Sequence, residues 1–337
     1  MAAALDGLLA SLERLFAIPP GHRSDDVPRA SALQVLGCDD AALDELLRRG
    51  LSHAGPAGDE RFDANDLFNL ALYSGAGRSV PERALRYAIR WMAESPEKLT
   101  ATRRWTFSVT LSCARPDGCG ADPLIAAALP VPELFGGRLE DVSIAPPPER
   151  GDEAGVECAG SEVQMTATVE TRGELRTIRS PRLRAIVDEV LGSGLRWVKV
   201  PASIHARPEL LLPHGVATCT ALSLHLAERC REAGFEARTR RGWMLGMLDL
   251  IHAWLEVEDE DGETKVVDPI FVLLAGLAPD AHPELPELCR GSVTNRLLPT
   301  TRAAGEPIDR HTCDGAEAPL AKRTTILPAR EPAAAPN

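Results

Sequence analysis

Residues 214–271 constrain the fold more than any other stretch, because one helical pattern and two strand patterns follow one another there with little chain between them. The helical pattern opens at Cys219 and repeats apolar residues at helical spacing as far as Ala233. Gly234 stands where a left-handed C-cap belongs, and Thr218 is a suitable N-cap. The pattern therefore predicts a helix with Cys219 in its first turn.

Two alternating segments after this helix predict a β-hairpin. His252 to Val257 alternates as a half-buried strand, and Thr264 to Asp268 is a second short strand beyond the turn residues 259–262. A five-residue loop would set His252 directly opposite Asp268, and a three-residue loop ending on Gly262 would make the two diagonal neighbours on one face. A two-residue Asp-Gly turn would place Asp268 on the opposite face.

These segments bring together three groups that suit nucleophilic catalysis. The N-terminus of a helix favours a thiolate at Cys219, and the Cys219 N–H is a natural donor to an oxyanion. His252 is a general base, and Asp268 could orient its imidazole in either of the same-face registers. The sequence therefore predicts a cysteine nucleophile, a histidine base and an orienting carboxylate.

At these residues the sequence resembles the transglutaminase-like superfamily, a papain-related group of transglutaminases, microbial proteases and amide-forming enzymes. The likeness covers the cysteine that opens the helix ending in "REAGFEAR" at 231–238, "HAWLEV" at 252–257 and "VVDP" at 266–269. The resemblance implies that Cys219 is the nucleophile, His252 the base and Asp268 the orienting acid. One departure concerns the turn before the cysteine, where the family commonly has glycine two residues earlier and this chain has Ala217, with Gly215 further upstream.

The remaining patterns predict an α+β protein with a papain/transglutaminase-like catalytic core preceded by a β-sandwich-like segment and an N-terminal helical module. Helical periodicity at 41–50 and 66–72, with a helix start at 79–82, indicates the helical module. Alternation at 104–111 and 163–169 indicates strands, and the segment 129–148 resembles the β-sandwich that precedes the core in bacterial members of the superfamily. The predicted boundaries are 1–95 for the helical module, 96–175 for the β-rich segment, 176–290 for the catalytic core and 291–337 for a C-terminal extension.

Composition excludes some classes of function. The chain has 337 residues, 44% of them hydrophobic, and a net charge of −12, which leaves no basic face for general nucleic-acid binding. Charged residues interrupt the apolar N-terminus, which therefore predicts an amphipathic helix and not a signal peptide. No apolar run is long enough to cross a bilayer. We expect a cytoplasmic protein without nucleic-acid or membrane partners; its oligomeric state stays open.

The eight cysteines are scattered and form no repeated C-x-x-C pair, which favours reduced thiols. Cys113 and Cys119 could hold zinc only with a distant ligand, and their Cys-x5-Cys spacing lacks a matching second pair. His311 and Cys313 resemble a second catalytic pair, but no clear framework surrounds them, and a surface pair is the favoured interpretation. No metal or cofactor is expected.

Other residues compete for roles in the site. His214 lies on the loop before the predicted helix and His225 more than one and a half turns along it, so both are weaker bases than His252. The resemblance offers Trp197 as a group that stabilises the transition state, although its spacing fits poorly and core packing is the favoured role.

Two charged runs also need an interpretation. The acidic run 258–263 lacks the ligand spacing of a calcium loop and indicates a solvated hairpin tip. Arg238, Arg240 and Arg241 indicate a solvated face or a site for an acidic substrate or carrier. The segment 295–300 could add an edge strand, and the Ala/Pro-rich end from about Pro328 should be disordered.

The sequence therefore predicts thiol-dependent acyl transfer through an acyl-cysteine thioester. The donor would be an amide or a thioester of a small molecule, a peptide or a carrier protein, and an amine acceptor would give a new amide. With water as acceptor the same three residues would make a cysteine peptidase or amidase. A non-catalytic scaffold of the same fold is the alternative from a different class.

Overall fold

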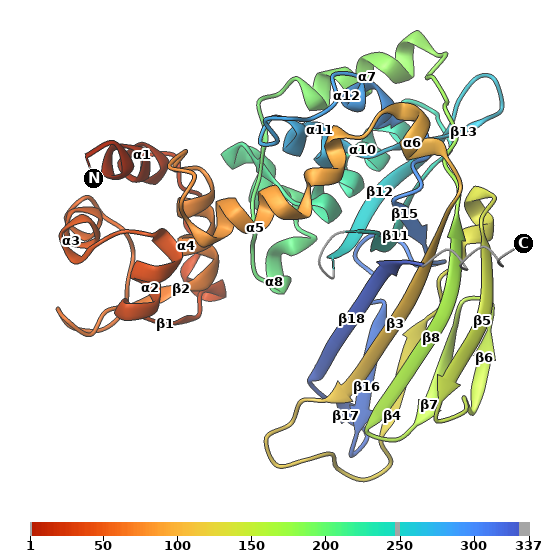
Figure 1. Cartoon of the computed structure of the whole chain (residues 1–337), viewed down its shortest axis with the longest axis horizontal. Coiled ribbons are helices and arrows are strands. Elements are labelled where there is room, and N and C mark those ends of the chain that lie inside the picture. Colours follow the sequence, from red (N-terminus) through yellow and green to blue (C-terminus); the bar gives the residue numbers. More distant parts are fainter. Residues whose placement is uncertain (1, 247–249, 330–337) are drawn as a thin grey trace, which may run out of the picture.

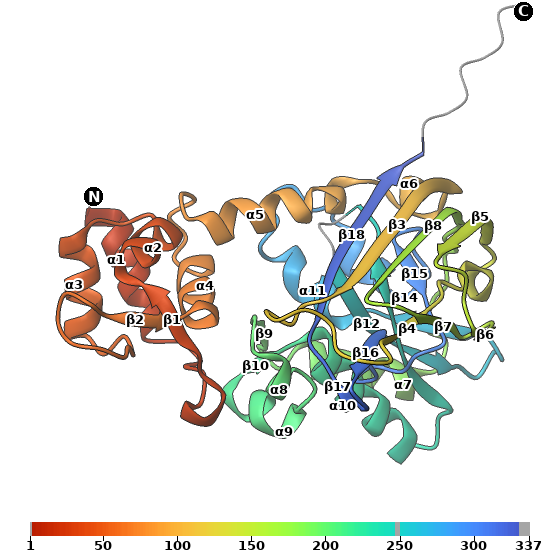
Figure 2. The same ribbon diagram turned by 90° about the horizontal axis from the view of Figure 1, so that it is seen from below.

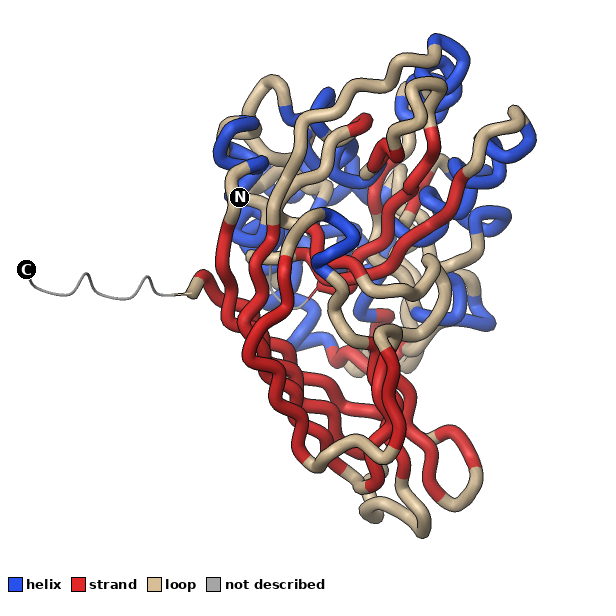
Figure 3. The backbone as a smooth tube through the Cα atoms, turned by 90° about the vertical axis from the view of Figure 1, so that its right-hand side faces the viewer, coloured by secondary structure: helices blue, strands red, loops and turns tan. Residues whose placement is uncertain are grey.

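The computed structural model describes residues 2–246 and 250–329. Figures 1 and 2 show a group of helices at the N-terminal end, set apart from a larger body that holds the remaining chain. Figure 3 shows that helices cover the strands in one half of this body, whereas the other half consists of strands and loops. Within the described ranges, the helices are all too short or too polar to cross a bilayer.

The N-terminal part is helical, and its helices follow the local signals in the sequence. Asp39 and Asp63 cap two of them with their side chains, and Ser79 with Glu82 forms a capping box at the start of a third. Leu8, Leu43 and Phe62 lie in one apolar core. The elements are α1 (Ala2–Leu12), η1 (Pro20–His22), β1 (Asp25–Pro28), α2 (Arg29–Leu36), α3 (Asp40–Arg48), β2 (Arg61–Asp63), α4 (Ala64–Leu72), α5 (Val80–Ala88), η2 (Arg90–Ala93) and α6 (Pro96–Thr100).

The half without helices is a sandwich of two sheets with one core between them. One sheet has the strand order β18-β3-β8-β5 and the other β17-β16-β4-β7-β6. Trp105 and Phe107 of β3 point into the same core as Ile125 of β4 and Cys158 of β7. The elements are β3 (Arg103–Cys113), β4 (Leu124–Ala128), η3 (Pro132–Phe135), β5 (Arg138–Ala145), β6 (Arg150–Asp152), β7 (Gly155–Ala159), β8 (Glu162–Thr171), β16 (Asp309–Cys313), β17 (Ala316–Glu317) and β18 (Leu320–Pro328).

The C-terminal residues complete this sandwich. β18 pairs with β3 along nine residues and β16 pairs with β4, so strands near the C-terminus enter both sheets. The expectation that His311 and Cys313 form a surface pair is wrong, because β16 carries both into the interior, where they are 1% and 0% exposed. The tail expected to be disordered lies, from residue 330 on, outside the described residues.

The other half is an antiparallel five-stranded sheet, in the order β14-β13-β12-β11-β15, with α10 packed against β11 and β12. The predicted α+β class is confirmed, and in this half a helix that opens on Cys219 packs on the sheet that carries His252. The elements are α7 (Pro181–Leu191), β9 (Arg196–Trp197), α8 (Ala202–His205), α9 (Pro208–Leu211), η4 (Leu212–His214), β10 (Val216–Ala217), α10 (Cys219–Glu232), β11 (Ala237–Met244), β12 (Leu250–Glu258), β13 (Thr264–Val267), α11 (Pro269–Ala275), α12 (Leu285–Leu288), β14 (Arg290–Gly291) and β15 (Leu297–Pro299).

The prediction that β12 is half-buried is wrong, because residues on both of its faces are buried. Ala253 and Leu255 on one face join the apolar core that also contains the α10 leucines. On the other face, Phe271 stacks on His252 and Phe135 packs against Trp254. The histidine therefore lies inside the protein, where a hydrogen-bond partner must satisfy its ring nitrogens.

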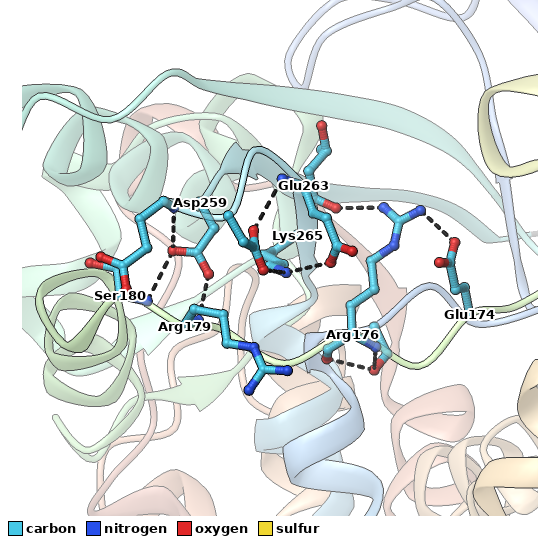
Figure 4. A network of polar contacts seen from close by, with 11 residues as sticks. Glu174, Arg176, Arg179, Ser180, Asp259, Glu263 and Lys265 are labelled. Atoms are coloured by element: carbon cyan, nitrogen blue, oxygen red, sulfur yellow. Dashed lines mark hydrogen bonds and ion pairs between the residues drawn. The ribbon is translucent and has the colours of Figure 1, made fainter.

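The tip of the β12–β13 hairpin is exposed at Glu258 and from Glu260 to Glu263, as expected for a solvated tip, whereas Asp259 is buried and ties the hairpin to the body of the protein. The buried Asp259 carboxylate accepts hydrogen bonds from the backbone N–H groups of Arg179 and Ser180, at 2.5 and 3.0 Å (Figure 4). The buried Lys265 ammonium lies 2.6 Å from Asp261 and 2.7 Å from Glu263. The acidic side chains of the turn therefore hold the hairpin in place.

We predict that Lys265→Ala lowers the free energy of unfolding by about 1 to 3 kcal/mol, since it removes a buried stem and leaves two carboxylates close together without their cation. Chemical denaturation of the two proteins would measure the difference. Lys98→Ala is the matched control, because Lys98 is exposed and its loss should change the free energy by less than about 0.5 kcal/mol. Equal stabilities of Lys265→Ala and the wild type would contradict this account of the hairpin.

Candidate active site

Cys219 is the first residue of α10, as the sequence predicts, and its position is fixed by the residue before it. The Thr218 hydroxyl accepts a hydrogen bond from the Ala221 N–H at 3.0 Å and donates one to the His205 carbonyl at 2.6 Å. One N-cap thus joins the start of α10 to the end of α8. Gly234 at the other end of the helix has a φ of 87°, in agreement with the predicted left-handed C-cap.

The turn before Cys219 contains the departure from the family pattern. Gly215 has a φ of 69° and so supplies the left-handed turn. Ala217 is extended and buried, in a short parallel pairing of β10 with β9 that places it beside Trp197. Alanine is therefore compatible with this turn, because glycine is needed only at position 215.

His252 and Asp268 meet through the register of the hairpin. Leu255 pairs with Val267 and Glu258 with Thr264. The Asp259 N–H donates to the Glu263 carbonyl at 3.0 Å, which leaves a three-residue turn that ends on Gly262, with a φ of 73°. This is the diagonal register, one of the two same-face alternatives. The His252 Nε2 atom lies 2.6 Å from the Asp268 Oδ2 atom, and both side chains are buried.

Asp268 has a second role at the end of the hairpin. Its Oδ1 atom accepts a hydrogen bond from the Phe271 N–H at 3.3 Å, so it is also the N-cap of α11, with Pro269 in the first helical position. The Phe271 ring in turn stacks on the His252 ring, with centroids 4.6 Å apart. The start of α11 therefore holds the carboxylate and covers one face of the imidazole.

Gly242 allows this crowded arrangement on the neighbouring strand. It pairs with His252 across β11 and β12, and a Cβ atom there would lie 2.1 Å from the Leu298 carbonyl oxygen and 2.9 Å from the Trp254 ring. A side chain at this position would therefore push β15 or Trp254 away from the histidine.

The electrostatics of the site favour a thiolate and an imidazolium. Burial would raise the pKa of the Cys219 thiol, but hydrogen bonding to His205 and His252 and the charge of these imidazoles outweigh it and bring the pKa well below its usual value. Burial would lower the pKa of His252, but Asp268 and the Cys219 thiolate overcome this effect and raise the pKa. Because Nε2 is engaged by Asp268, Nδ1 is the nitrogen left to face the thiol.

His205 is the residue that sequence reasoning missed. It ends the short helix α8, on the loop that precedes the nucleophile, and no motif or periodicity marks it. His205 lies beside the thiol because the Thr218 hydroxyl donates a hydrogen bond to the His205 backbone carbonyl. This contact cannot be inferred from the spacing of residues in the sequence. The two histidines that were weighed as alternatives lie elsewhere: His214 packs against Phe16, and His225 lines a separate cavity beside Glu228 and Arg231.

Cys219, His205 and His252 face a cavity of about 400 Å³. Most of its wall is apolar, Lys199 contributes a cation, and Trp197 forms part of the wall. The apolar lining residues are Phe68, Ala84, Leu85, Ala88, Val198, Val200, Met244, Leu250, Ile251, Ile270, Phe271 and Leu274. The volume is in the range of ligand sites for small molecules.

The N-terminal module supplies part of this wall. Phe68 comes from α4, and Ala84, Leu85 and Ala88 come from α5. The α4 helix and its C-cap Tyr73 also hold the adjoining wall, because the Asn69 amide exchanges two hydrogen bonds with the backbone of Lys199 and the Tyr73 hydroxyl donates to the Trp197 carbonyl at 2.5 Å. The module is therefore part of the cavity as well as a packing unit.

The predicted basic cluster is solvated only in part, since Arg238 is exposed whereas Arg240 is buried. Arg240 is buried and forms a bidentate pair with the buried Glu256, which also pairs with Arg238. Arg241 donates to the Glu306 carbonyl at 2.6 Å. These guanidinium groups satisfy partners within the fold, so they give no support to an acidic-substrate site.

Comparisons with known proteins add solved structures of low similarity. No family model and no curated protein matches the chain. One solved structure is a candidate cysteine protease from Cytophaga hutchinsonii, with 13% identity, a TM-score of 0.41, and coverage of 69% of this chain and 93% of that one. Another is the periplasmic domain of TgpA from Pseudomonas aeruginosa bound to ethylmercury, with 16% identity, a TM-score of 0.25, and coverage of 59% and 96%. At these TM-scores the overlays carry no argument about function, which therefore rests on the geometry of the site.

We predict that the alkylation rate of Cys219 changes little between about pH 6 and pH 9, since its depressed pKa keeps the thiolate populated in acid and the raised His252 pKa keeps the imidazolium in base. Alkylation by iodoacetamide, followed by peptide mapping across this range, measures it. Cys230 on the same helix is the internal control, because burial raises its pKa to about 11.

His252→Ala should restore the dependence of an ordinary thiol, with a rate at about pH 6 at least tenfold below that of the wild type. A smaller loss of the alkylation rate at about pH 6 in His205→Ala would show that His205 is the second group that lowers the pKa of Cys219. A rate for wild-type Cys219 that rises about tenfold per pH unit towards pH 8.5 would contradict the thiolate–imidazolium pair.

Proposed function

We propose that the protein is a thiol acyltransferase that works through an acyl-Cys219 thioester. The observation that carries the proposal is the buried thiol whose pKa is lowered by two imidazoles at an apolar cavity, one of them held by a carboxylate. Groups that are tuned in this way and face a cavity are typical of active sites.

The proposed reaction has two halves. The Cys219 sulfur attacks the carbonyl carbon of an amide or thioester, the tetrahedral intermediate collapses, and the His252 imidazolium gives its proton to the leaving amine or thiol. An acceptor amine then loses a proton to His252 as it attacks the thioester, which forms an amide and regenerates the thiol. Asp268 keeps its negative charge throughout and holds Nε2–H of His252.

The start of α10 provides the proposed oxyanion site. The first N–H groups of a helix have no partner within the helix, and the Ala221 N–H is already taken by Thr218. The Cys219 N–H is thus the backbone donor next to the carbonyl under attack. Trp197, in the wall beside it, is the side chain that the superfamily resemblance offers for the same purpose.

The cavity favours an apolar acyl group. Aliphatic and aromatic side chains form its wall, and Lys199 is the cation there, which suits a single carboxylate or phosphate on an otherwise apolar donor. The donor that we propose is a small or carrier-bound acyl group. An apolar wall also disfavours ordered water near the thioester, which supports transfer to an amine over hydrolysis.

We predict that Cys219→Ala abolishes turnover and the formation of an acyl adduct, because no other group replaces the sulfur. Intact-protein mass spectrometry after incubation with candidate aryl and alkyl thioesters and peptides measures the adduct, and amine or water capture identifies the acceptor. Cys230→Ala is the matched control on the same helix and should keep both the adduct and the turnover. Full turnover by Cys219→Ala would refute the proposal, and a wild-type protein without any adduct would favour a non-catalytic scaffold.

We predict that Asp268→Asn lowers kcat/KM by roughly 10 to 1000-fold, less than the ~10⁴-fold loss in a serine triad. Asparagine keeps the N-cap of α11 and a hydrogen bond to His252 but removes the charge that stabilises the imidazolium. A thiol with a depressed pKa depends less on that charge than a hydroxyl does. Kinetics and the alkylation profile of the mutant measure both effects, and His252→Ala should be more severe. Unchanged kinetics in Asp268→Asn would leave Asp268 as a helix cap only.

A further inference from the structure

A second group of chemically reactive side chains lies in the sandwich, at the end remote from α10 (Figure 1). It consists of Cys113 at the end of β3, Cys119 in the loop between β3 and β4, and His311 and Cys313 on β16. Cys119 and His311 are separated by 192 residues in sequence, yet their Sγ and Nε2 atoms lie 3.3 Å apart. The four ligand atoms all lie within 4.8 Å of one another.

We propose that Cys113, Cys119, His311 and Cys313 bind one structural zinc ion. Three thiolates and one imidazole are an established ligand set for tetrahedral zinc. With bonds of about 2.3 Å to sulfur and about 2.0 Å to nitrogen, the ligand atoms of such a site are roughly 3.5 to 3.8 Å apart. The side chains described here lie close to this spacing, so small rotations of the cysteines would close the site.

The imidazole of His311 is already set for a metal. Its Nδ1 atom lies 3.1 Å from the Leu124 carbonyl oxygen, which can only accept, so Nδ1 carries the proton. In the neutral ring this leaves the lone pair on Nε2, the atom that faces Cys119. A hydrogen bond from the second ring nitrogen to a carbonyl is the usual way in which a zinc-binding histidine is oriented.

The surroundings also suit three thiolates. Arg115 donates to the Cys313 sulfur at 3.1 Å and to the Asp314 carboxylate at 2.5 Å. Zinc with three thiolates and a neutral imidazole carries a net charge of −1, and the Arg115 guanidinium lies between this charge and the Asp314 carboxylate. Asp314 also holds the loop between β3 and β4, because its Oδ1 atom accepts a hydrogen bond from the Ala121 N–H at 2.7 Å.

A structural role follows from the elements that the ligands join. β3 belongs to one sheet of the sandwich and β16 to the other, and Cys119 comes from the loop that crosses between them. His311 and Cys313 are buried and lie two residues apart on the same face of β16. Metal binding would therefore cross-link the two sheets and fix the loop 114–123, without any contact with the site at Cys219.

The test measures zinc in the full chain, purified without a polyhistidine tag or chelator. Elemental analysis should give about one zinc per chain, and replacement by cobalt should give the thiolate-to-metal and d–d absorption of a tetrahedral site. Cys119→Ser, at the half-buried loop position, should lower zinc affinity at least about tenfold. Cys38→Ser, another half-buried cysteine, and Cys219→Ala should both keep the metal, so this result is independent of the proposed acyl transfer.

Three results would overturn the proposal. The first is a zinc content in Cys119→Ser equal to that of the wild type. The second is a wild-type protein that stays free of metal after incubation with zinc under reducing conditions. The third is a disulfide among Cys113, Cys119 and Cys313, detected by mass spectrometry in the wild-type protein. If Cys119→Ser does not fold, the wild-type protein can be treated with a thiol-modifying reagent instead. The proposal then predicts that one zinc ion is released as Cys113, Cys119 and Cys313 are modified.

Discussion

The hydrogen bond between His252 and Asp268 depends on the length of one turn. The three residues from Glu260 to Gly262 make His252 and Asp268 diagonal neighbours, whereas a turn shorter by one residue would send Asp268 to the other face of the sheet. The buried Asp259 and Lys265 fix this turn through contacts on both sides. The chemistry at Cys219 therefore rests on ionic groups at the far end of the same hairpin.

Burial sets the second condition for the site. A buried imidazole would ordinarily lose its charge, and a buried thiol would ordinarily keep its proton. In this protein the Asp268 carboxylate and the mutual attraction of Cys219 and His252 reverse both tendencies. This reversal requires that water be kept away, and the α4 and α5 helices contribute by covering the cavity with Phe68 and Leu85. The N-terminal module thus affects the electrostatics of residues that it does not itself contain.

Sequence patterns predicted those parts of the structure that depend on residues close together in the sequence. The N-cap Thr218, the C-cap Gly234, the alternation of β3 and the same-face placement of His252 and Asp268 all follow from spacing along one segment. The burial of both faces of β12 could not be predicted from the sequence, because it depends on the packing of elements that are distant along the chain.

Contacts between distant segments were missed for the same reason. The Thr218 hydroxyl donates to the His205 carbonyl across 13 residues and so holds His205 beside the start of α10. The pairing of β18 with β3 joins strands from the C-terminal and N-terminal ends of the sandwich sequence. The sequence did not predict the cluster of Cys113 and Cys119 with His311 and Cys313, because the second two residues lie on a strand nearly two hundred residues further along the chain. Neither spacing nor periodicity carries information about which strands become neighbours.

The five-stranded sheet and the sandwich are joined by side chains at the end of β11. Trp243 of β11 and Leu245, just beyond it, belong to the core of the sandwich, where Trp243 packs edge-to-face on Phe107. Met244 between them points into the catalytic core and lines the cavity. Because successive side chains of a strand point to opposite faces, one strand contributes to both cores.

The order of the chain adds a further constraint. β11 lies between β12 and β15, and the sandwich is completed by β16 and β18; β15, β16 and β18 all follow Cys219, His252 and Asp268 in the chain. The core around Trp243 accordingly contains Leu298 of β15 beside residues of the sandwich strands. These later strands carry none of the three groups proposed for catalysis, yet β15 pairs directly with β11, the strand opposite His252.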